Sequence, residues 1–280
     1  MNKEKNSVPY KRKRWLRWLN ILLVIYLLCG VAVYFFQDRF LFHPEKMAAN
    51  TAYNFPYPNK ELNIPLDNNY SMNVVQFLTK DSTPKGVVLF FHGNRKNIDW
   101  YAAYAPFFTK NNYEVWVIDY PGFGKSTGDL TEKKLYDFAD QLYTLAKSKY
   151  SSDRIIIYGK SLGTGIAAWL ASKKSCSQVV LETPYYSITS LFSHYLPVYP
   201  MSKILKYQLP TYSYLGITNA PVTIFHGTAD KVIPYSNAIK LKEVLKPNDH
   251  FITIENGEHN NLKEYPQFVQ SLDSLLNLHK

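Results

Sequence analysis

Apolar residues recur along the chain in two patterns, and these patterns predict the elements of the fold. After residue 61, short unbroken apolar runs typical of buried strands alternate with stretches whose apolar residues recur every three or four positions. Strands are expected at 62–64, 72–78, 86–91, 113–119, 154–158, 178–181, 221–225 and 251–254. Helices are expected at 98–110, 131–150, 162–172, 236–245 and 262–278. Unbroken apolar strands separated by helices are buried on both faces, so we predict an α/β fold with a mostly parallel sheet.

Two segments depart from this alternation. Residues 185–219 are rich in Tyr, Ser and Pro, and they are long for a simple connection. We expect them to form an insertion or lid within a domain that covers 62–280. Residues 37–61 are rich in aromatic residues and proline, and we expect them to be a connector.

The longest apolar run lies near the N-terminus, at 19–36, where only Asn20 is strongly polar. A helix of this length just crosses a hydrocarbon core of about 30 Å, so we expect a transmembrane helix or signal anchor. The alternative is a signal peptide cleaved near Gly30-Val31-Ala32. Since the apolar run continues to Phe36, it is long for a signal peptide.

The net charge of +10 is concentrated in front of this apolar run. Residues 1–17 carry seven basic side chains against one acidic side chain, which leaves +4 for the rest of the chain. Lys and Arg gather on the cytoplasmic side of membrane spans. We therefore expect a basic cytoplasmic tail at 1–18 and an extracytoplasmic C-terminal domain. This topology explains the basic residues, so no nucleic-acid partner is expected.

Composition and spacing exclude several kinds of site. Two cysteines, Cys29 and Cys176, are too few for a disulfide scaffold, a zinc ribbon or an iron–sulfur cluster. No H-E-x-x-H or comparable ligand spacing occurs, so no metal is expected. GTGIAA at 163–168 resembles a dinucleotide-binding loop, but Lys160-Ser161 occupies the first turn, where glycine is required. We therefore expect no cofactor.

Polar motifs follow three of the predicted strands. Ser161 lies in GKSLG, between the strand at 154–158 and the following helix, which is the setting of a nucleophile elbow. Asp230 follows the strand at 221–225, and His259 follows the last strand. The carboxyl ends of parallel strands meet at one edge of a sheet. We therefore predict a triad in which Ser161 is the nucleophile, His259 the base and Asp230 its orienting carboxylate. The alternative for Ser161 is an ordinary helix N-cap.

A glycine turn after the strand at 86–91 is expected to complete the site. There the backbone N–H of Asn94 can face Ser161 and form an oxyanion hole with the N–H of Leu162. His92 and His226 precede glycines at strand ends, and we expect them to brace turns. Glu182 also ends a strand, and it is the weaker candidate for the triad acid.

Four aromatic residues are candidates for substrate binding. We expect Tyr120, Phe123, Tyr185 and Tyr186 to line an acyl site, although buried aromatic side chains are more often plain core.

Six motifs together resemble one group of known proteins. They are FFHGN (90–94), DYPGFGKSTG (119–128), YGKSLGTG (158–165), LETPYYSI (181–188), HGTADKVIP (226–234) and GEHN (257–260). The chain resembles the serine-hydrolase branch of the α/β-hydrolase superfamily and, within it, the membrane-anchored Bem46-like group. The apolar N-terminus followed by QDRFLFHPE (37–45) is also similar to that group. The resemblance implies an α/β-hydrolase fold and metal-free hydrolysis of esters or thioesters.

These observations predict a membrane-anchored serine hydrolase that cleaves carboxylic ester or thioester bonds through an acyl-enzyme. The aromatic connector and the Tyr-rich insertion favour a lipophilic ester, so a small-molecule or lipid acyl ester and the bilayer are the expected partners. Three alternatives stay open. They are an acyltransferase or a peptidase on the same triad, and a catalytically silent, membrane-tethered binding protein. The sequence does not specify the acyl chain, the head group or the oligomeric state.

Overall fold

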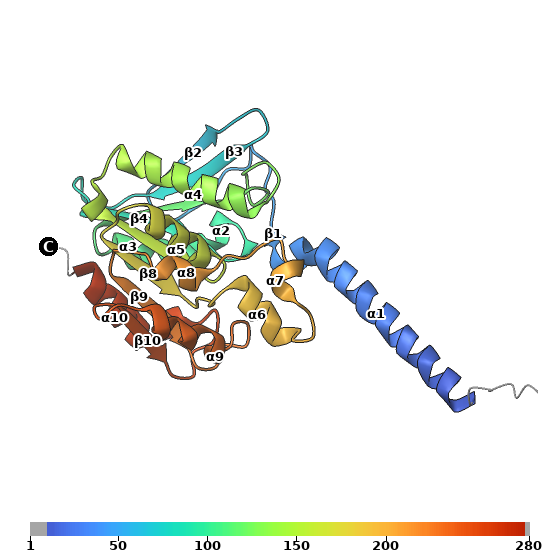
Figure 1. Ribbon diagram of the computed structural model, residues 1–280. Coiled ribbons are helices and arrows are strands. Elements are labelled where there is room, and N and C mark those ends of the chain that lie inside the picture. Colours follow the sequence, from blue (N-terminus) through green and yellow to red (C-terminus); the bar gives the residue numbers. More distant parts are fainter. Residues whose placement is uncertain (1–9, 278–280) are drawn as a thin grey trace, which may run out of the picture.

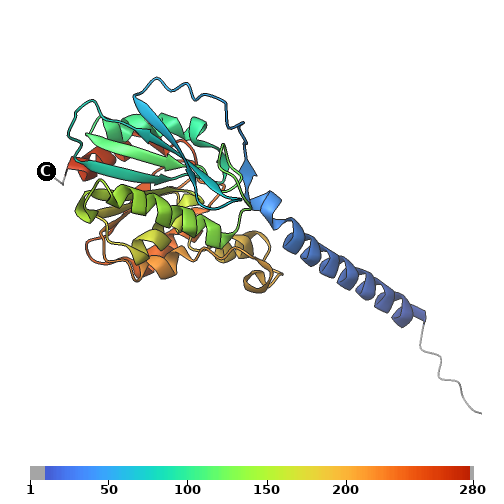
Figure 2. The same cartoon turned by 90° about the horizontal axis from the view of Figure 1, so that it is seen from above.

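A computed structural model describes residues 10–277 as a long N-terminal helix followed by an α/β domain (Figure 1). Helix α1, Tyr10–Leu41, projects from the domain in both views (Figures 1 and 2). Its part Arg14–Leu41 is long and apolar enough to cross a membrane, and the domain buries none of its most apolar 18-residue stretch. The helix extends beyond 19–36 at both ends, so it includes the first residues of the expected connector.

One eight-stranded sheet forms the centre of the domain, in the order β10-β9-β8-β7-β4-β6-β3-β2. Its strands are β2 Asn59–Pro65, β3 Ser71–Phe77, β4 Gly86–Phe91, β6 Tyr113–Ile118, β7 Ile155–Lys160, β8 Gln178–Glu182, β9 Val222–Gly227 and β10 His250–Ile254. The pairs β2–β3 and β3–β6 are antiparallel, and the remaining pairs are parallel. This arrangement confirms the predicted α/β fold with a mostly parallel sheet.

Helices cover both faces of the sheet (Figure 1). The α-helices after α1 are α2 Ile98–Tyr101, α3 Ala105–Thr109, α4 Glu132–Lys147, α5 Gly163–Lys173, α6 Ile188–Tyr195, α7 Met201–Ile204, α8 Thr211–Leu215, α9 Tyr235–Ala238 and α10 Pro266–Asn277. The 3₁₀ helices are η1 Ala102–Tyr104, η2 Ser152–Arg154, η3 Ile239–Val244 and η4 Leu262–Glu264.

Successive side chains of β4 show how the two faces are buried. Val87 and Leu89 pack into one apolar cluster with residues of α4 and α5, whereas Val88 and Phe90 pack into a second cluster with residues of α3 and α10. Because side chains alternate along a strand, an unbroken apolar run serves both clusters at once. The central strands are therefore held rigidly, and they fix where the loops at their carboxyl ends begin.

Three expected helices are divided in the structure. The stretch 98–110 forms α2, η1 and α3, and Pro106 lies in the first turn of α3. Proline lacks an N–H group and is tolerated in a first turn but not in a helix interior. For the same reason α10 begins at Pro266 rather than at Leu262. The stretch 236–245 is α9 followed by η3.

The connector and the insertion both lie near the carboxyl end of the sheet. Strand β1, His43–Pro44, pairs in parallel with β5, Arg95–Lys96, in the loop that follows β4. The insertion forms α6, α7 and α8, and α7 contacts α1 (Figure 1). The end of α1 is thereby fastened to the loops that surround Ser161.

Candidate active site

Ser161 occupies a sharp turn between β7 and α5. Its φ of 50° lies in the left-handed region that residues other than glycine rarely adopt. The turn also depends on Gly163, because a Cβ atom there would collide with the carbonyl oxygen of Phe91. The N-terminus of α5 can therefore approach the end of β4 closely, and Ser161 lies at the apex of the turn. This geometry is typical of a nucleophile elbow.

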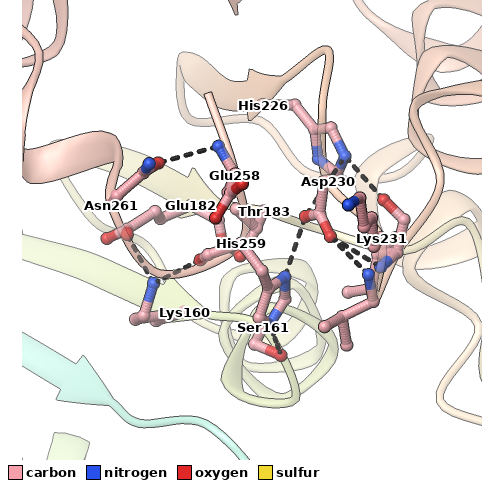
Figure 3. Close-up of polar contacts among 12 residues, drawn as sticks. Lys160, Ser161, Glu182, Thr183, His226, Asp230, Lys231, Glu258, His259 and Asn261 are labelled. Atoms are coloured by element: carbon pink, nitrogen blue, oxygen red, sulfur yellow. Dashed lines mark hydrogen bonds and ion pairs between the residues drawn. The ribbon is translucent and has the colours of Figure 1, made fainter. Parts of the chain in front are cut away.

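Ser161, His259 and Asp230 form a hydrogen-bonded chain (Figure 3). His259 Nε2 lies 2.9 Å from Ser161 Oγ, and His259 Nδ1 lies 2.8 Å from Asp230 Oδ2. The loops after β7, β9 and β10 supply the three residues, which are all buried. In this geometry Nδ1–H donates to the carboxylate and leaves Nε2 free to accept the serine proton. The structure thus brings together the three residues predicted to form the triad.

The surroundings of Asp230 keep its carboxyl group ionised. Burial raises the pKa of Asp230, but the hydrogen bond and the charge of His259 outweigh burial, so the pKa lies below its ordinary value. Asp230 Oδ1 also accepts the N–H groups of Val232 and Ile233, both at 2.8 Å. The imidazole of His259 therefore has a fixed anionic partner.

The residues predicted for the oxyanion hole lie beside Ser161. Asn94 and Leu162 line the same cavity as Ser161. The side chain of Asn94 donates to the carbonyl oxygen of Leu41 at 2.7 Å, and the backbone carbonyl oxygen of Asn94 accepts the N–H of His43 at 2.8 Å. The end of α1 therefore holds the loop that carries Asn94. Leu162 precedes the N-terminus of α5, where helix N–H groups favour negative charge.

A buried ion pair lies beside the nucleophile (Figure 3). Lys160 Nζ lies 2.5 Å from Glu182 Oε1, and both side chains are almost fully buried. Lys160 also donates to the carbonyl oxygen of His259 at 3.1 Å. The hydroxyls of Tyr104 and Tyr158 donate to the same carboxylate. The pair thus ties the Ser161 turn to the loop that carries His259.

Comparison with known proteins adds to this geometry. The family described as serine aminopeptidase S33 matches residues 82–217, which include Ser161 but neither Asp230 nor His259. Alpha/beta hydrolase domain-containing protein 17C of Xenopus tropicalis is 28% identical over 193 residues, which are 68% of this chain and 61% of that protein. Its Homo sapiens counterpart matches at the same identity over 57% of its length. The chain thus spans about three fifths of the length of these curated relatives.

Solved structures share the arrangement of strands and helices. An esterase of Pyrococcus furiosus superposes with a TM-score of 0.66 at 19% identity, over 85% of this chain and 98% of that chain. A 2,6-dihydroxy-pseudo-oxynicotine hydrolase superposes with a TM-score of 0.64 at 17% identity, over 81% of this chain and 70% of that chain. The chain has the α/β-hydrolase fold, and the family match and the curated relatives support its membership of the α/β-hydrolase superfamily. The family match and the curated relatives support a hydrolase function.

Two cavities of this α/β-hydrolase meet at Ser161. The larger, about 410 Å³, contains His43, Arg95, Lys96 and Lys160 in its wall and no carboxylate. The smaller, about 140 Å³, is lined mostly by apolar side chains of α1, α6 and the loop after Asp230. The nucleophile therefore faces a basic cavity on one side and an apolar cavity on the other. A third hollow, lined by residues of β2, α4 and α5, contains none of the predicted site residues.

The four aromatic candidates for substrate binding lie in different places. Tyr185 lines the apolar cavity and donates to the carbonyl oxygen of Leu162 at 3.0 Å. Tyr120 and Phe123 are fully buried in the core instead. Tyr186 stacks on Tyr212 and lines neither cavity at Ser161. The structure therefore brings only Tyr185 of the four into the site.

His92, His226 and Glu182 lie outside the hydrogen-bonded triad, in agreement with the sequence analysis. His92 Nδ1 lies 2.7 Å from the carbonyl oxygen of Gly93, and His226 Nε2 lies 3.0 Å from that of Ile233. Both side chains brace loops, as expected. Burial lowers the pKa of His226 and keeps its ring neutral. Glu182 pairs with Lys160 rather than with His259.

Sequence reasoning misses two groups of residues at this site. The first is the Lys160–Glu182 pair, which could have been found because the two residues end adjacent strands in register. The second is the last turn of α1, where Phe40 and Leu41 line the apolar cavity. Nothing in the local pattern indicates that the long N-terminal helix reaches the nucleophile. Among the residues that the structure describes, no group of three His, Cys, Asp or Glu could hold a metal ion.

Proposed function

We propose that this protein is a membrane-anchored serine hydrolase that cleaves carboxylic ester or thioester bonds through an acyl-enzyme. The observation that carries the proposal is the hydrogen-bonded chain of Ser161, His259 and Asp230 at the junction of a basic and an apolar cavity. A serine that is already bonded to an oriented imidazole is an activated nucleophile.

The reaction has two half-reactions. Ser161 Oγ attacks the acyl carbonyl carbon while His259 Nε2 takes the hydroxyl proton, and Asp230 stabilises the resulting imidazolium. The tetrahedral intermediate collapses, His259 returns the proton to the leaving alcohol or thiol, and the acyl group stays on Ser161. A water molecule then attacks the acyl carbonyl carbon while His259 takes its proton, the bond to Ser161 Oγ breaks, and His259 returns the proton to Ser161 as the carboxylic acid is released.

The backbone N–H groups of Asn94 and Leu162 are proposed to bind the oxyanion of each tetrahedral intermediate. Their presence in one cavity wall with Ser161 supports this role. Removing one such donor typically costs about 3–4 kcal/mol of transition-state stabilisation. Because Leu41 and His43 hold the Asn94 loop, the end of α1 is also proposed to keep the first donor in place.

The charges around Ser161 favour an ester over the N-terminus of a peptide. An aminopeptidase must bind the ammonium group of its substrate, and a carboxylate in the site is the suitable partner for it. The basic cavity contains Arg95, Lys96 and Lys160, and no carboxylate lies in its wall, because Glu182 pairs with Lys160 and Glu45 pairs with Lys96 outside the cavity. Aminopeptidase activity is nevertheless the second candidate, because the matching family is described as serine aminopeptidase.

Helix α1 is proposed to anchor the hydrolase in a bilayer. Its apolar part supports a single span, and the basic residues before it support a cytoplasmic N-terminus. The α/β domain would then lie on the extracytoplasmic side. Protease protection of right-side-out vesicles tests this orientation, since digestion of the domain by external protease is expected.

Fluorophosphonate labelling of detergent-solubilised protein tests the nucleophile. Wild type is expected to carry one adduct on Ser161, mapped by mass spectrometry, and Ser161→Ala is expected to carry none. Labelling that persists in the variant would overturn the assignment. Well-folded wild type that never labels would instead favour a membrane-tethered binding protein.

A substrate panel separates the reaction types. Wild type is expected to hydrolyse p-nitrophenyl esters and thioesters and to leave aminoacyl anilides intact. Faster cleavage of the anilides would favour the aminopeptidase. Accumulation of a new ester when an alcohol is added would favour an acyltransferase.

A further inference from the structure

The segment between α6 and α7 packs against the membrane helix. The rings of Tyr26 and Tyr199 stack with their centroids 4.5 Å apart and their planes 1° from parallel. The hydroxyl of Tyr26 donates to the carbonyl oxygen of Val198 at 3.0 Å, and that of Tyr199 donates to the carbonyl oxygen of Tyr26 at 2.9 Å. Gly30 leaves room for the ring of Tyr199, since a Cβ atom there would lie 3.2 Å from it. The contact is thus specific and reciprocal.

The position of this contact along α1 sets its depth in a bilayer. Tyr26 lies eleven residues before Gln37, which is about 16 Å along a helix. A span of about 20 residues that begins at the interfacial Trp18 ends near Gln37. The contact at Tyr26 and Gly30 therefore falls in the hydrocarbon layer. Gln37, whose side chain is buried by bonds to the backbone of Ile204 and Lys206, lies near the interface.

The segment 195–201 has an apolar composition, and most of its backbone N–H groups are hydrogen-bonded. It reads Tyr-Leu-Pro-Val-Tyr-Pro-Met, with no charged residue, and Val198 is 68% exposed while Tyr195 is 52% exposed. Backbone polar groups in hydrocarbon need partners within the protein. The two prolines have no N–H group, and the N–H groups of Leu196, Tyr199 and Met201 are bonded within the segment or to α6, whereas the N–H of Val198 makes no hydrogen bond with the described residues.

The apolar cavity beside Ser161 lies between the end of α1 and helix α6, which leads into this segment. Phe40 of α1 and Phe192 of α6 line it, as does Val232. Phe40 is 62% exposed and Val232 is 52% exposed, so apolar surface continues from the cavity to the outside of the protein. The hydroxyl of Tyr195 bonds the carbonyl oxygens of Lys231 and Val232, which joins the segment to the triad loop.

We propose that residues 195–200 lie in the hydrocarbon layer beside α1 and that the apolar cavity admits an acyl chain to Ser161 directly from the bilayer. The substrate class is then an ester or thioester whose long acyl chain resides in the membrane. The cleaved bond sits at the headgroup level, with its leaving group in the basic cavity. The inference rests on the proposed membrane anchoring and ester hydrolysis.

A fluorescent probe at Val198 measures the depth of the segment without any catalytic readout. The full chain carries Cys29→Ala, Cys176→Ala and Val198→Cys, is labelled with a nitrobenzoxadiazole probe and is reconstituted in phosphatidylcholine vesicles. The proposal predicts stronger quenching by a nitroxide on carbon 12 of the acyl chain than by one on the headgroup. It also predicts no quenching by aqueous iodide.

Ile217→Cys in the same background is the matched control. Ile217 is 61% exposed, but it follows α8 and precedes β9, so it lies at the opposite edge of the sheet from Ser161. Its probe is expected to be quenched by iodide and not by the acyl-chain nitroxide. Iodide quenching at position 198 as well would overturn the proposal. Fluorophosphonate labelling of the same samples reports separately on the proposed hydrolysis, so failure of one does not imply failure of the other.

A charge in the segment tests the route of the substrate. In vesicles, Val198→Lys is expected to lower kcat/KM for a long-chain acyl ester about tenfold relative to kcat/KM for p-nitrophenyl acetate, because a lysine in hydrocarbon is costly. Ile217→Lys is expected to leave this ratio unchanged. An unchanged ratio in Val198→Lys, with the protein folded and reconstituted, would show that the acyl chain enters elsewhere.

Discussion

The two sides of Ser161 are built in different ways. On the sheet side, Asp230, His259 and the Lys160–Glu182 pair are buried and are joined by hydrogen bonds and ion pairs at strand ends. On the other side, the last turn of α1 and the helix α6 enclose the apolar cavity with partly exposed aromatic and aliphatic side chains. The sheet side can fix the positions of reacting atoms, whereas the α1–α6 side can select what binds. Chemistry and specificity are therefore expected to respond to different substitutions.

The largest effect is expected from Asp230→Asn on the sheet side. The amide would donate to His259 Nδ1, which moves the imidazole proton to Nε2 and leaves no acceptor for the proton of Ser161. We expect kcat for p-nitrophenyl acetate to fall about 10⁴-fold.

The matched control for Asp230→Asn is Asp249→Asn. Asp249 is a buried carboxylate that bonds Val222 and Lys246 away from the site. The variant Asp249→Asn is expected to change stability but not kcat. Comparable kcat values for the two variants would contradict the proposed role of Asp230.

Breaking the ion pair beside Ser161 is expected to cost stability as well as activity. Lys160→Met leaves the carboxylate of Glu182 buried without its partner, which typically costs about 3–5 kcal/mol. Denaturant unfolding of the solubilised full chain measures the loss. Adding Glu182→Gln should recover part of it, because the uncompensated charge is removed. Exposed ion pairs contribute about 1 kcal/mol or less. A loss of that size in the free energy of unfolding of Lys160→Met would contradict the burial of the pair.

Filling the apolar cavity tests the other side of Ser161. Leu191→Trp adds bulk to the wall formed by α6, so it should exclude part of a long acyl chain while short acyl groups still fit. Each buried methylene contributes about 0.8 kcal/mol, so losing two lowers kcat/KM for octanoyl relative to acetyl esters more than tenfold. Equal losses for both esters would mean that the cavity does not hold the acyl chain.

The smallest expected effect is a dependence of stability on pH. Burial lowers the pKa of His226 in the folded protein, whereas an unfolded histidine titrates near pH 6.5. Below that pH the unfolded chain binds a proton that the folded chain does not, so stability falls by up to about 1.4 kcal/mol per pH unit. Tm measured from pH 7 to 5 should decrease, and His226→Gln should flatten the slope. Asp230, whose pKa is lowered in the folded protein, adds a further loss only in stronger acid.

The sheet side of the site can be predicted from the sequence because its signals are local. Ser161, Asp230 and His259 each follow an unbroken apolar run, and parallel strands bring such positions to one edge. The same pattern predicts where the strands lie but not the helix breaks, although Pro106 is a local signal for the break within 98–110. The triad geometry therefore follows from alternation of strands and helices plus three motifs.

The other side of the site cannot be predicted in this way because its contacts are distant in sequence. Phe40 meets residues of α6 about 150 positions away, and Tyr26 meets Tyr199 across 173 positions. The hydrophobic periodicity within either segment does not predict these contacts. The expected connector at 37–61 likewise contains β1, which pairs with Arg95–Lys96. No local sequence pattern predicts this contact.

Trapping the acyl-enzyme tests the central claim most directly. Wild-type protein is mixed with p-nitrophenyl octanoate, quenched in acid within the first turnover and digested for mass spectrometry. The account predicts an octanoyl group on the peptide that contains Ser161, with a burst of one nitrophenol per chain. Ser161→Ala should show neither. Rapid hydrolysis by wild type without an octanoyl group on Ser161, or with the group on another residue, would contradict it.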